Sequence, residues 1–591
     1  MSRIAGLVVL AALMALVAAF PAGAQVQAPP KTPTAEGRGG SAATVDPLAT
    51  QAAIDVLRSG GNAVDAAVAA AGVLGVVEPF SCGIGGGGFM VIYDAERGRV
   101  DTIDSREAAP ARLAEDAFVP FIPTDKFEEA RVSGLSAGVP GTVAGWETAL
   151  ERYGSRSMRS LLRRGARIAR EGFVTDAVFA KQVADNQEIF DDFTSTREVY
   201  LTPAGTAPPA GSVHRNPDMA RTYERIARDP GRFYRGAIAR DIAETVQDPP
   251  EAPDSDRPHD VIPGEMTRRD LRRYEAIWRK PTRINYRGLD VYGMGPPSSG
   301  GTTVGEALNI LEGFPMSRLS REQALHYYLE ASKLAYADRG AFVADPAFFD
   351  VPLRGLLSDS FAAERRALIG EQALPAPQPA GDPSGDEQAK STTHLTVADR
   401  WGNVVSYTFT IEQIGGNGIV VPGRGFLLNN ELTDFNFATG TANSPDGGKR
   451  PRSSMSPTIV FDRRGPAVAL GSPGGATIIT TVLQTLVNHI DFGMSLPEAV
   501  AEPRASQRNG AVPTDPAPPA GTIERTEAEP AFIAKYGAPL TARGHYFTPT
   551  APPGEIGTVA AIRFLRHGRQ QAVAEPTRRG GGSAMVVRPS G

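Results

Sequence analysis

The chain is poor in the residues that mark a disulfide framework or a metal centre. Of its 591 residues only Cys82 is a cysteine, so no disulfide bond can form within the chain. The seven histidines are scattered, without a pair at metal-ligand spacing. No block of like charge stands out, and a formal net charge of -5 gives no reason to expect nucleic acid as a partner. We therefore predict no metal and no other cofactor, and we expect Cys82 to be buried and inert.

Long apolar runs are also absent beyond the N-terminus. Arg3 precedes an apolar stretch from Ile4 to Phe20, and the small residues "AGA" (22–24) fit a cleavage site before Gln25. An uncleaved membrane anchor is the alternative, because the run is long for a signal. We expect residues 1–24 to be a removed signal peptide, the mature protein to be periplasmic or secreted, and no membrane contact after removal.

The remaining chain reads as mixed helix and strand, with no repeat of fixed period. Apolar periodicity predicts helices over 46–78 (broken at 59–62), 144–170, 217–228, 320–338 and 475–490. The stretch "FMVIYDAERGRVDTID" predicts a hairpin. "LPAPQPAGDPSGDEQAK", Leu374 to Lys390, is rich in proline and polar residues, so we expect a flexible linker that does not pack well.

A strand pattern begins directly after that linker, at Thr392. If the hairpin loop is "DRWGN", centred on Trp401, Thr392 stands opposite Thr410 on the neighbouring strand. Alternation then gives one apolar face and one face of hydroxyl and imidazole groups. The apolar face carries Leu395, Val397, Val405, Tyr407 and Phe409.

A strand that starts on a threonine suggests a particular kind of nucleophile. A cut between Ser391 and Thr392 would give Thr392 an α-amino group with a reference pKa of about 7.7–8.0. That amine could take the proton from the hydroxyl of the same residue, so no histidine is needed. Gly474-Gly475, at the start of the predicted helix 475–490, could bind an oxyanion with backbone N–H groups. A plain strand-to-helix turn is the alternative for these glycines.

Several long motifs resemble one family, the γ-glutamyltransferases (glutathione hydrolases), in order and over nearly the whole chain after residue 24. They are "GGNAVDAAVAA", "GIGGGGF", "REAAPA", "STTHLTVADRWGN", "GFLLNNELTDF", "KRPRSSMSPT" and "GSPGGATIITTVLQ". The resemblance implies an α/β (α+β) fold, the four-layer αββα sandwich of N-terminal-nucleophile hydrolases. It also implies self-cleavage between Ser391 and Thr392. The large fragment, 25–391, and the small one, 392–591, would stay associated because their strands share one sandwich.

The resemblance also assigns roles to single residues. Thr392 matches the nucleophile, and Thr410 the threonine that assists it. Gly474 and Gly475 match the oxyanion-binding glycines. The positions that match substrate contacts form a clamp for a zwitterion: Arg106, Ser453 and Ser454 for the α-carboxylate, Glu431 and Asp434 for the α-ammonium. The implied reaction transfers the γ-glutamyl group of glutathione and related amides, through a Thr392 ester, to water, amino acids or peptides.

Two departures from the family pattern bear on substrate choice. Glu412 stands where many members have asparagine, and an ionised glutamate can only accept hydrogen bonds. The segment between Phe437 and Lys449 is short and lacks the longer lid loop of some members. An acylase of the same fold that acts on glutaryl-cephalosporins therefore stays open as an alternative. A second alternative, of another class, is a non-catalytic exported binding protein that is not processed.

Two further motifs match known patterns but lack the required context. "GLSAG" fits the G-x-S-x-G elbow around Ser136, yet Pro140 and Gly141 follow where a helix should begin. "GIGGGG" fits a dinucleotide-binding pattern, but a strand-like run follows it instead of a helix. We expect this glycine loop to let backbone pass close to the active centre.

Overall fold

The pairing of the strands determines where Thr392 lies in the fold. The computed structural model describes residues 30–122, 126–257, 261–380, 392–512, 523–551 and 554–590. The predicted signal peptide, most of the predicted linker and Ser391 lie outside these described residues. Within them, no helix combines the length and the apolar character that a membrane crossing requires.

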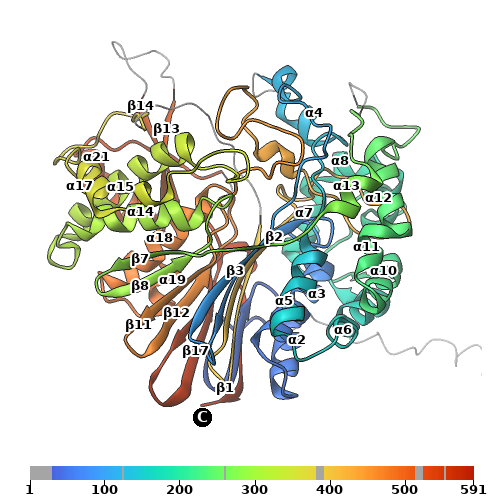
Figure 1. Ribbon diagram of the computed structural model, residues 1–591, viewed down its shortest axis with the longest axis horizontal. Coiled ribbons are helices and arrows are strands. Elements are labelled where there is room, and N and C mark those ends of the chain that lie inside the picture. Colours follow the sequence, from blue (N-terminus) through green and yellow to red (C-terminus); the bar gives the residue numbers. More distant parts are fainter. Residues whose placement is uncertain are drawn as a thin grey trace, which may run out of the picture.

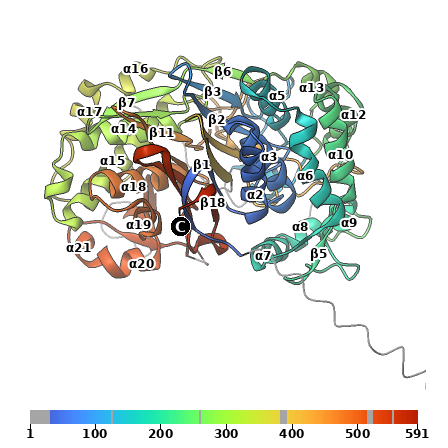
Figure 2. The same cartoon turned by 90° about the horizontal axis from the view of Figure 1, so that it is seen from below.

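One antiparallel sheet of 13 strands folds over on itself into two layers (Figures 1 and 2). The strand order is β6-β3-β2-β10-β9-β1-β17-β16-β12-β11-β8-β7, with β18 added on β1. The long strand β1 joins the layers, because its first half pairs with β17 and its second half with β9 and β18. The strands of the first layer are β1 (Thr34–Thr44), β2 (Gly87–Asp94), β3 (Arg99–Ser105), β6 (Ile277–Arg279), β9 (Thr393–Asp399), β10 (Val404–Thr410) and β18 (Ser583–Pro589). Those of the second are β7 (Thr282–Tyr286), β8 (Leu289–Gly293), β11 (Thr458–Asp462), β12 (Gly465–Gly471), β16 (Ala560–Phe564) and β17 (Arg569–Ala574).

Helices cover the outer face of each layer, which completes four layers (Figure 2). On one side are α2 (Pro47–Arg58), α3 (Ala63–Val77), α5 (Thr142–Tyr153), α6 (Met158–Glu171), α10 (Pro217–Arg228) and α12 (Ala237–Gln247). On the other are α14 (Gly300–Glu312), α15 (Arg321–Phe342) and α18 (Thr477–Ile490). Each side has its own large apolar core, one between the first helices and β9–β10, one between the second set and β11–β12. A small sheet of β13 (Ala505–Val512), β14 (Ile523–Ala528) and β15 (Phe547–Pro549) packs beside α15.

The helices largely follow the sequence pattern. Residues 46–78 form two helices separated at 59–62, and the second begins with a capping box between Asn62 and Asp65. The predicted helix 144–170 is two helices, because the chain leaves helical geometry at Gly154 and restarts at the N-cap Ser157. The helices predicted at 217–228, 320–338 and 475–490 are confirmed as α10, α15 and α18. The hairpin predicted from "FMVIYDAERGRVDTID" is confirmed as β2–β3.

The register predicted for the second hairpin is confirmed. Val404 pairs with Ala398 and Phe409 with Thr393, around a turn in which Asp399 and Asn403 bond to each other. The apolar face of the hairpin is buried and packs on α3. The hydroxyl face is also buried, because it meets the second layer, where Ser406 Oγ donates to the Leu470 carbonyl oxygen at 3.0 Å.

The linker prediction was wrong for the part that the structure describes. Ala376 and Ala380 are buried, and the Gln378 N–H donates to Asn509 Oδ1 at 2.6 Å. Two small buried alanines interrupt the prolines, and Gln378 between them bonds to Asn509 of β13, which composition alone does not show. The expectation for 381–390 lies outside the described residues.

The glycine loop before β2 does bring backbone close to the hairpin. A Cβ atom on Gly86 would lie 1.8 Å from the carbonyl oxygen of Thr410, and one on Gly85 would lie 2.0 Å from that of Leu427. Only glycine fits at these two positions. Ser136 of "GLSAG" donates to the Arg131 carbonyl oxygen at 2.7 Å, in a turn without a preceding strand, so the elbow interpretation is excluded.

Candidate active site

Thr392 lies directly before β9, between the two sheet layers. Its side chain is buried, and its Oγ1 donates to Thr410 Oγ1 at 3.4 Å. Thr410 is held in turn by the backbone N–H of Glu412, which donates to its Oγ1 at 2.8 Å. The carbonyl oxygen of Thr392 accepts a hydrogen bond from Arg579 Nη1 at 3.0 Å. The first residue of the hairpin is therefore fixed by its side chain and by its backbone.

Arg106 is anchored by the loop that carries the serine pair. Its Nε donates to the carbonyl oxygen of Pro451 at 3.1 Å, and its Nη2 to that of Arg452 at 3.0 Å. The Tyr274 hydroxyl donates to the Arg106 carbonyl oxygen at 2.6 Å. The remaining donors of the guanidinium meet the carboxylates of Glu431 and Asp434. Arg106 is thus buried with its charge compensated.

Glu431 and Asp434 project from a short 3₁₀ turn, η4 (Glu431–Asp434). Asn429 fixes this turn, since its Oδ1 accepts from the Glu431 N–H at 3.0 Å and from the Gly138 N–H at 2.9 Å. Glu107 lies behind it, with one carboxyl oxygen 3.9 Å from Arg106. Burial, together with the Glu431 carboxylate, raises the pKa of Glu107 well above its usual range. Burial and the neighbouring carboxylate therefore both favour the protonated form of Glu107.

One pocket gathers the predicted side chains from distant parts of the chain. It is lined by Arg106, Thr392, Thr410, Glu412, Glu431, Asp434, Ser453, Ser454, Met455, Gly475 and Ile478. A guanidinium and two hydroxyls thus share the pocket with three carboxylates, and the Thr392 hydroxyl lies among them. Of the predicted residues, Gly474 is outside this lining and Ser391 is outside the described chain.

The glycine pair forms the turn into α18. Gly474 has φ +137° and Gly475 has φ +56°, values that suit glycine and few other residues. A Cβ on Gly474 would also lie 2.7 Å from Thr477 Oγ1. The first bonds of the turn run from the Thr477 N–H to the Gly474 carbonyl and from the Ile478 N–H to the Gly475 carbonyl. The N–H groups of the glycines themselves precede this ladder, where helices leave donors for other partners.

Glu412 occupies an unusual backbone position beside the nucleophile. Its φ of +80° is left-handed, a region that asparagine enters more readily than glutamate does. Its Oε2 accepts from Asn430 Nδ2 at 2.5 Å, and the residue is 1% exposed. The third carboxylate of the pocket is therefore held by a neutral amide and stands on the same turn as Thr410.

A profile of the family described as Gamma-glutamyltranspeptidase matches residues 49–585. The chain belongs to this family. A glutathione hydrolase proenzyme of Bacillus subtilis (strain 168) is 41% identical over 525 residues, which are 84% of this chain and 86% of the relative. The Acylase ACY 1 proenzyme of Pseudomonas sp. (strain V22) is 35% identical over 541 residues, 90% of each chain.

Among solved structures, the cephalosporin acylase from Bacillus halodurans matches with a TM-score of 0.81 at 29% identity, over 94% of this chain and 97% of that one. The predicted sandwich of N-terminal-nucleophile hydrolases is confirmed by this likeness. The family membership likewise confirms that the chain is an enzyme of the γ-glutamyltransferase and glutathione hydrolase family. Acylases of the same fold are relatives as well, so the range of acyl groups is a question for the pocket itself.

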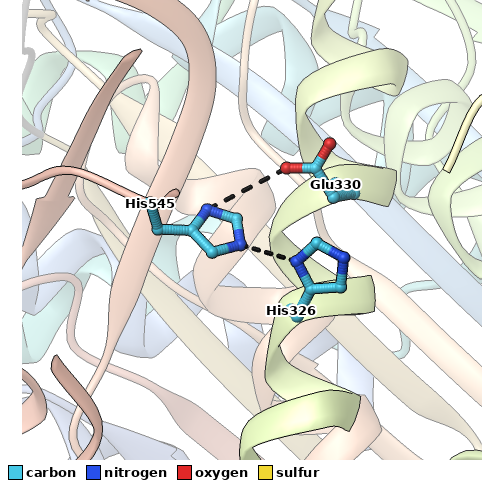
Figure 3. Close-up of side chains that lie close together, drawn as sticks. All are labelled: His326, Glu330 and His545. Atoms are coloured by element: carbon cyan, nitrogen blue, oxygen red, sulfur yellow. Dashed lines mark hydrogen bonds and ion pairs between the residues drawn. The ribbon is translucent and has the colours of Figure 1, made fainter. Parts of the chain in front are cut away.

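None of the residues in a second titratable cluster, shown in Figure 3, lines this pocket. His326 and Glu330 of α15 meet His545, with 2.8 Å between His326 Nδ1 and His545 Nε2. The sequence spacing gave no hint of this, since the two histidines are 219 residues apart. His326 Nε2 bonds to the Gly370 carbonyl oxygen at 3.0 Å, and Glu330 Oε1 accepts from Lys333 Nζ at 2.8 Å. These donors and acceptors are already engaged, so we assign the cluster a structural role that ties α15 to its neighbours.

The sequence reasoning missed residues that hold the pocket together. Asn429 and Asn430 lie inside the quoted motif "NNELTDF", and their position next to Glu431 was an available signal. Arg339 and Arg579 gave no such signal, because their partners Ser454 and Thr392 are 115 and 187 residues away in the sequence.

Proposed function

We propose that this chain is a self-cleaving γ-glutamyltransferase and hydrolase whose donors are γ-glutamyl amides, glutathione first. The observation that carries the proposal is the lining of a single pocket. A threonine hydroxyl lies there with one group of donors suited to a carboxylate and one group of carboxylates suited to an ammonium. A γ-glutamyl group has these two charges on one carbon and an acyl carbon at the other end.

Maturation would begin with the hydroxyl of Thr392. Its oxygen attacks the carbonyl carbon of Ser391, the peptide C–N bond breaks, and an ester forms while the amine takes up the proton. Water then hydrolyses the ester and frees both the carboxylate of Ser391 and the hydroxyl of Thr392. The products would be 25–391 and 392–591, after removal of 1–24 during export to the periplasm or the medium. Thr410, bonded to Thr392 Oγ1, keeps the hydroxyl oriented for the attack.

Turnover would repeat the same chemistry on the substrate. The free amine of Thr392 accepts the hydroxyl proton as the oxygen attacks the γ-carbonyl carbon. The N–H groups at Gly474 and Gly475 stabilise the oxyanion. The bond to the leaving amine breaks, the amine takes the proton, and a γ-glutamyl ester remains on Thr392. Water or the amino group of an acceptor then attacks this ester.

The charges of the pocket explain why a zwitterion would enter. Without substrate, Arg106 bonds to Glu431 and Asp434, so the two halves of the clamp neutralise each other. An α-carboxylate can replace these partners on Arg106 in a bidentate manner, while the α-ammonium takes over the released carboxylates. Such an exchange conserves the number of ion pairs in a buried site, which avoids leaving any charge unpaired.

The test uses γ-glutamyl-4-nitroanilide and the purified protein. We expect wild-type protein to migrate as two bands on a denaturing gel, with the small fragment beginning Thr-Thr-His, and to release 4-nitroaniline. Thr392→Ala should stay a single band and release none, whereas Thr392→Ser should keep both reactions at a reduced rate. An active protein with an unbroken 391–392 bond would overturn the proposal, and so would an unprocessed wild-type protein that only binds its ligand.

An acylase for glutaryl amides is the second candidate, and two observations favour keeping it. A relative named as an acylase is similar over 90% of the chain, and the solved cephalosporin acylase matches the fold closely. A glutaryl group keeps the carboxylate but lacks the ammonium. Glutaryl-4-nitroanilide tested beside the γ-glutamyl compound separates the two: a preference for the glutaryl compound would favour the acylase.

A further inference from the structure

Arg339, in the last turn of α15, reaches the serine pair from outside the pocket. The residue is 4% exposed. Its Nε donates to Ser299 Oγ at 2.6 Å, and its Nη2 donates to Ser454 Oγ at 2.8 Å. One guanidinium therefore bridges the residue that precedes α14 and a residue that lines the pocket.

The direction of these bonds determines which way Ser454 can donate. A guanidinium has donors only, so both serine oxygens must accept from it. Ser299 then sends its own proton to the Ser453 carbonyl oxygen at 2.6 Å. The Ser454 hydroxyl oxygen accepts from Arg339 on one side, so the hydroxyl proton can be donated to an acceptor on the pocket side. A carboxylate is such an acceptor, and a hydrogen bond to a charged group is a strong one.

The loop and the helix also hold each other from the other direction. Arg452 Nη1 donates to the carbonyl oxygens of Arg339 at 3.3 Å and of Gly340 at 3.1 Å, where the helix ends. A cation at this end of a helix meets the negative pole of its dipole. Arg339 and Arg452 are both buried, so the wall behind the serine pair is built from two guanidinium groups that are fixed in place.

We propose that Arg339 is a positioning residue that sets Ser454 to bind the α-carboxylate of the donor substrate. The inference rests on the proposed function, because it names the part of the γ-glutamyl group that this wall recognises. Arg339 does not line the pocket, so it acts through Ser454.

The experiment compares two anilides that differ only in the α-carboxylate. γ-Glutamyl-4-nitroanilide has it, whereas 4-aminobutanoyl-4-nitroanilide keeps the ammonium and lacks it. For Arg339→Met we expect kcat/KM on the γ-glutamyl compound to fall about 10- to 100-fold, mostly through KM. On the aminobutanoyl compound we expect a change below about threefold. Arg339→Lys should fall between, because one ammonium cannot bridge Ser299 and Ser454 as the fork does.

A double-mutant cycle separates positioning from general support. In a Ser454→Ala background, Arg339→Lys should change the logarithm of kcat/KM by less than half of the change that it causes in the wild-type background. The reason is that Ser454, the residue through which Arg339 acts, no longer has its hydroxyl. Self-cleavage into two bands serves as the folding control, and the cycle needs only the milder lysine variant if methionine prevents folding. Equal losses on both anilides, or additive effects in the cycle, would overturn the inference.

These failures are distinct from failure of the proposed function. A wild-type protein that releases nitroaniline from neither compound would refute the proposed donor chemistry itself. In that case, calorimetry can still measure the contribution of Arg339 by comparing the affinities of the protein for L-glutamate and for 4-aminobutanoate. Weaker binding of glutamate alone in Arg339→Lys would support the inference, and unchanged binding of both would overturn it.

Discussion

Glu412→Gln tests how this pocket selects its substrate. The change removes one negative charge and little else. Glutamine has the same length, its carbonyl oxygen can still accept from Asn430, and the left-handed backbone at φ +80° is as demanding for glutamine as for glutamate. Any change in substrate preference caused by Glu412→Gln can therefore be attributed to the loss of the carboxylate.

The contacts of the pocket limit how far Glu412→Gln can lower kcat/KM on a γ-glutamyl substrate. Glu431 and Asp434 share the charge of Arg106, and the Glu412 carboxylate accepts a hydrogen bond from the amide of Asn430. A hydrogen bond to a charged group contributes about 1.5–3 kcal/mol. Loss of one such bond to the α-ammonium corresponds to a fall of about 10- to 100-fold in kcat/KM. We expect the lower half of this range, because two carboxylates remain.

The assay compares γ-glutamyl-4-nitroanilide with glutaryl-4-nitroanilide, which has no ammonium. Glu412→Gln should lower kcat/KM on the first compound and leave the second unchanged or improved, so the ratio of the two falls at least tenfold. Glu412→Asn, which carries the residue of many family members, should lower the ratio in the same direction. Equal losses on both compounds would refute the reasoning, because Glu412 would then support the fold or Thr410 and would not read the ammonium.

Three further predictions follow from contacts around the pocket. Thr410→Ala should slow self-cleavage about tenfold on a gel time course, and Thr410→Ser should not, because the serine retains the hydroxyl beside Thr392; equal rates would contradict this. Glu107→Gln should keep kcat/KM within about threefold near pH 7, since the raised pKa already makes Glu107 neutral, whereas Glu431→Gln should lose at least tenfold; a large loss in Glu107→Gln would show a charged Glu107. Burial lowers the pKa of His394 to about 3, so its stabilising contribution is present above pH 6.5 and is lost as pH falls toward 3. Between pH 7.5 and 4.5 the protonation of this histidine in the unfolded chain should lower the free energy of unfolding by about 3 kcal/mol. Urea unfolding of uncut Thr392→Ala protein should therefore show a shallower pH dependence when His394→Asn is added; parallel curves would contradict the pKa.

What the sequence could predict was set by local pattern. The hairpin register followed from the alternation of apolar and hydroxyl residues, because a slip by one residue would have turned every side chain to the other face. The turn at Gly474-Gly475 followed from two glycines before an apolar helix. The candidate residues came from short motifs that resemble one family, so each lies within a few positions of the residues that identify it.

The contacts that the sequence did not predict join segments that are far apart in the chain and share no local pattern. Arg339 lies on a helix whose other residues fill a core, and its partner Ser454 belongs to a loop 115 residues later. Arg579 reaches Thr392 from near the end of the chain. The histidine pair of Figure 3 likewise forms only when α15 meets the segment after β14. Such pairs depend on how the layers stack, and that stacking is a property of the whole chain.

The order of the strands has a consequence for how such an enzyme can be encoded. β10 and β9, from the segment after Thr392, lie between β2 and β1 from the segment before it, and β8 and β7 extend a row that begins with β17. Neither segment could bury its strand edges if it were synthesised alone. If the gene were split at this junction, each half should therefore expose unpaired strand edges and aggregate. Synthesis as one chain lets the strands of both segments pair before the chain is cut.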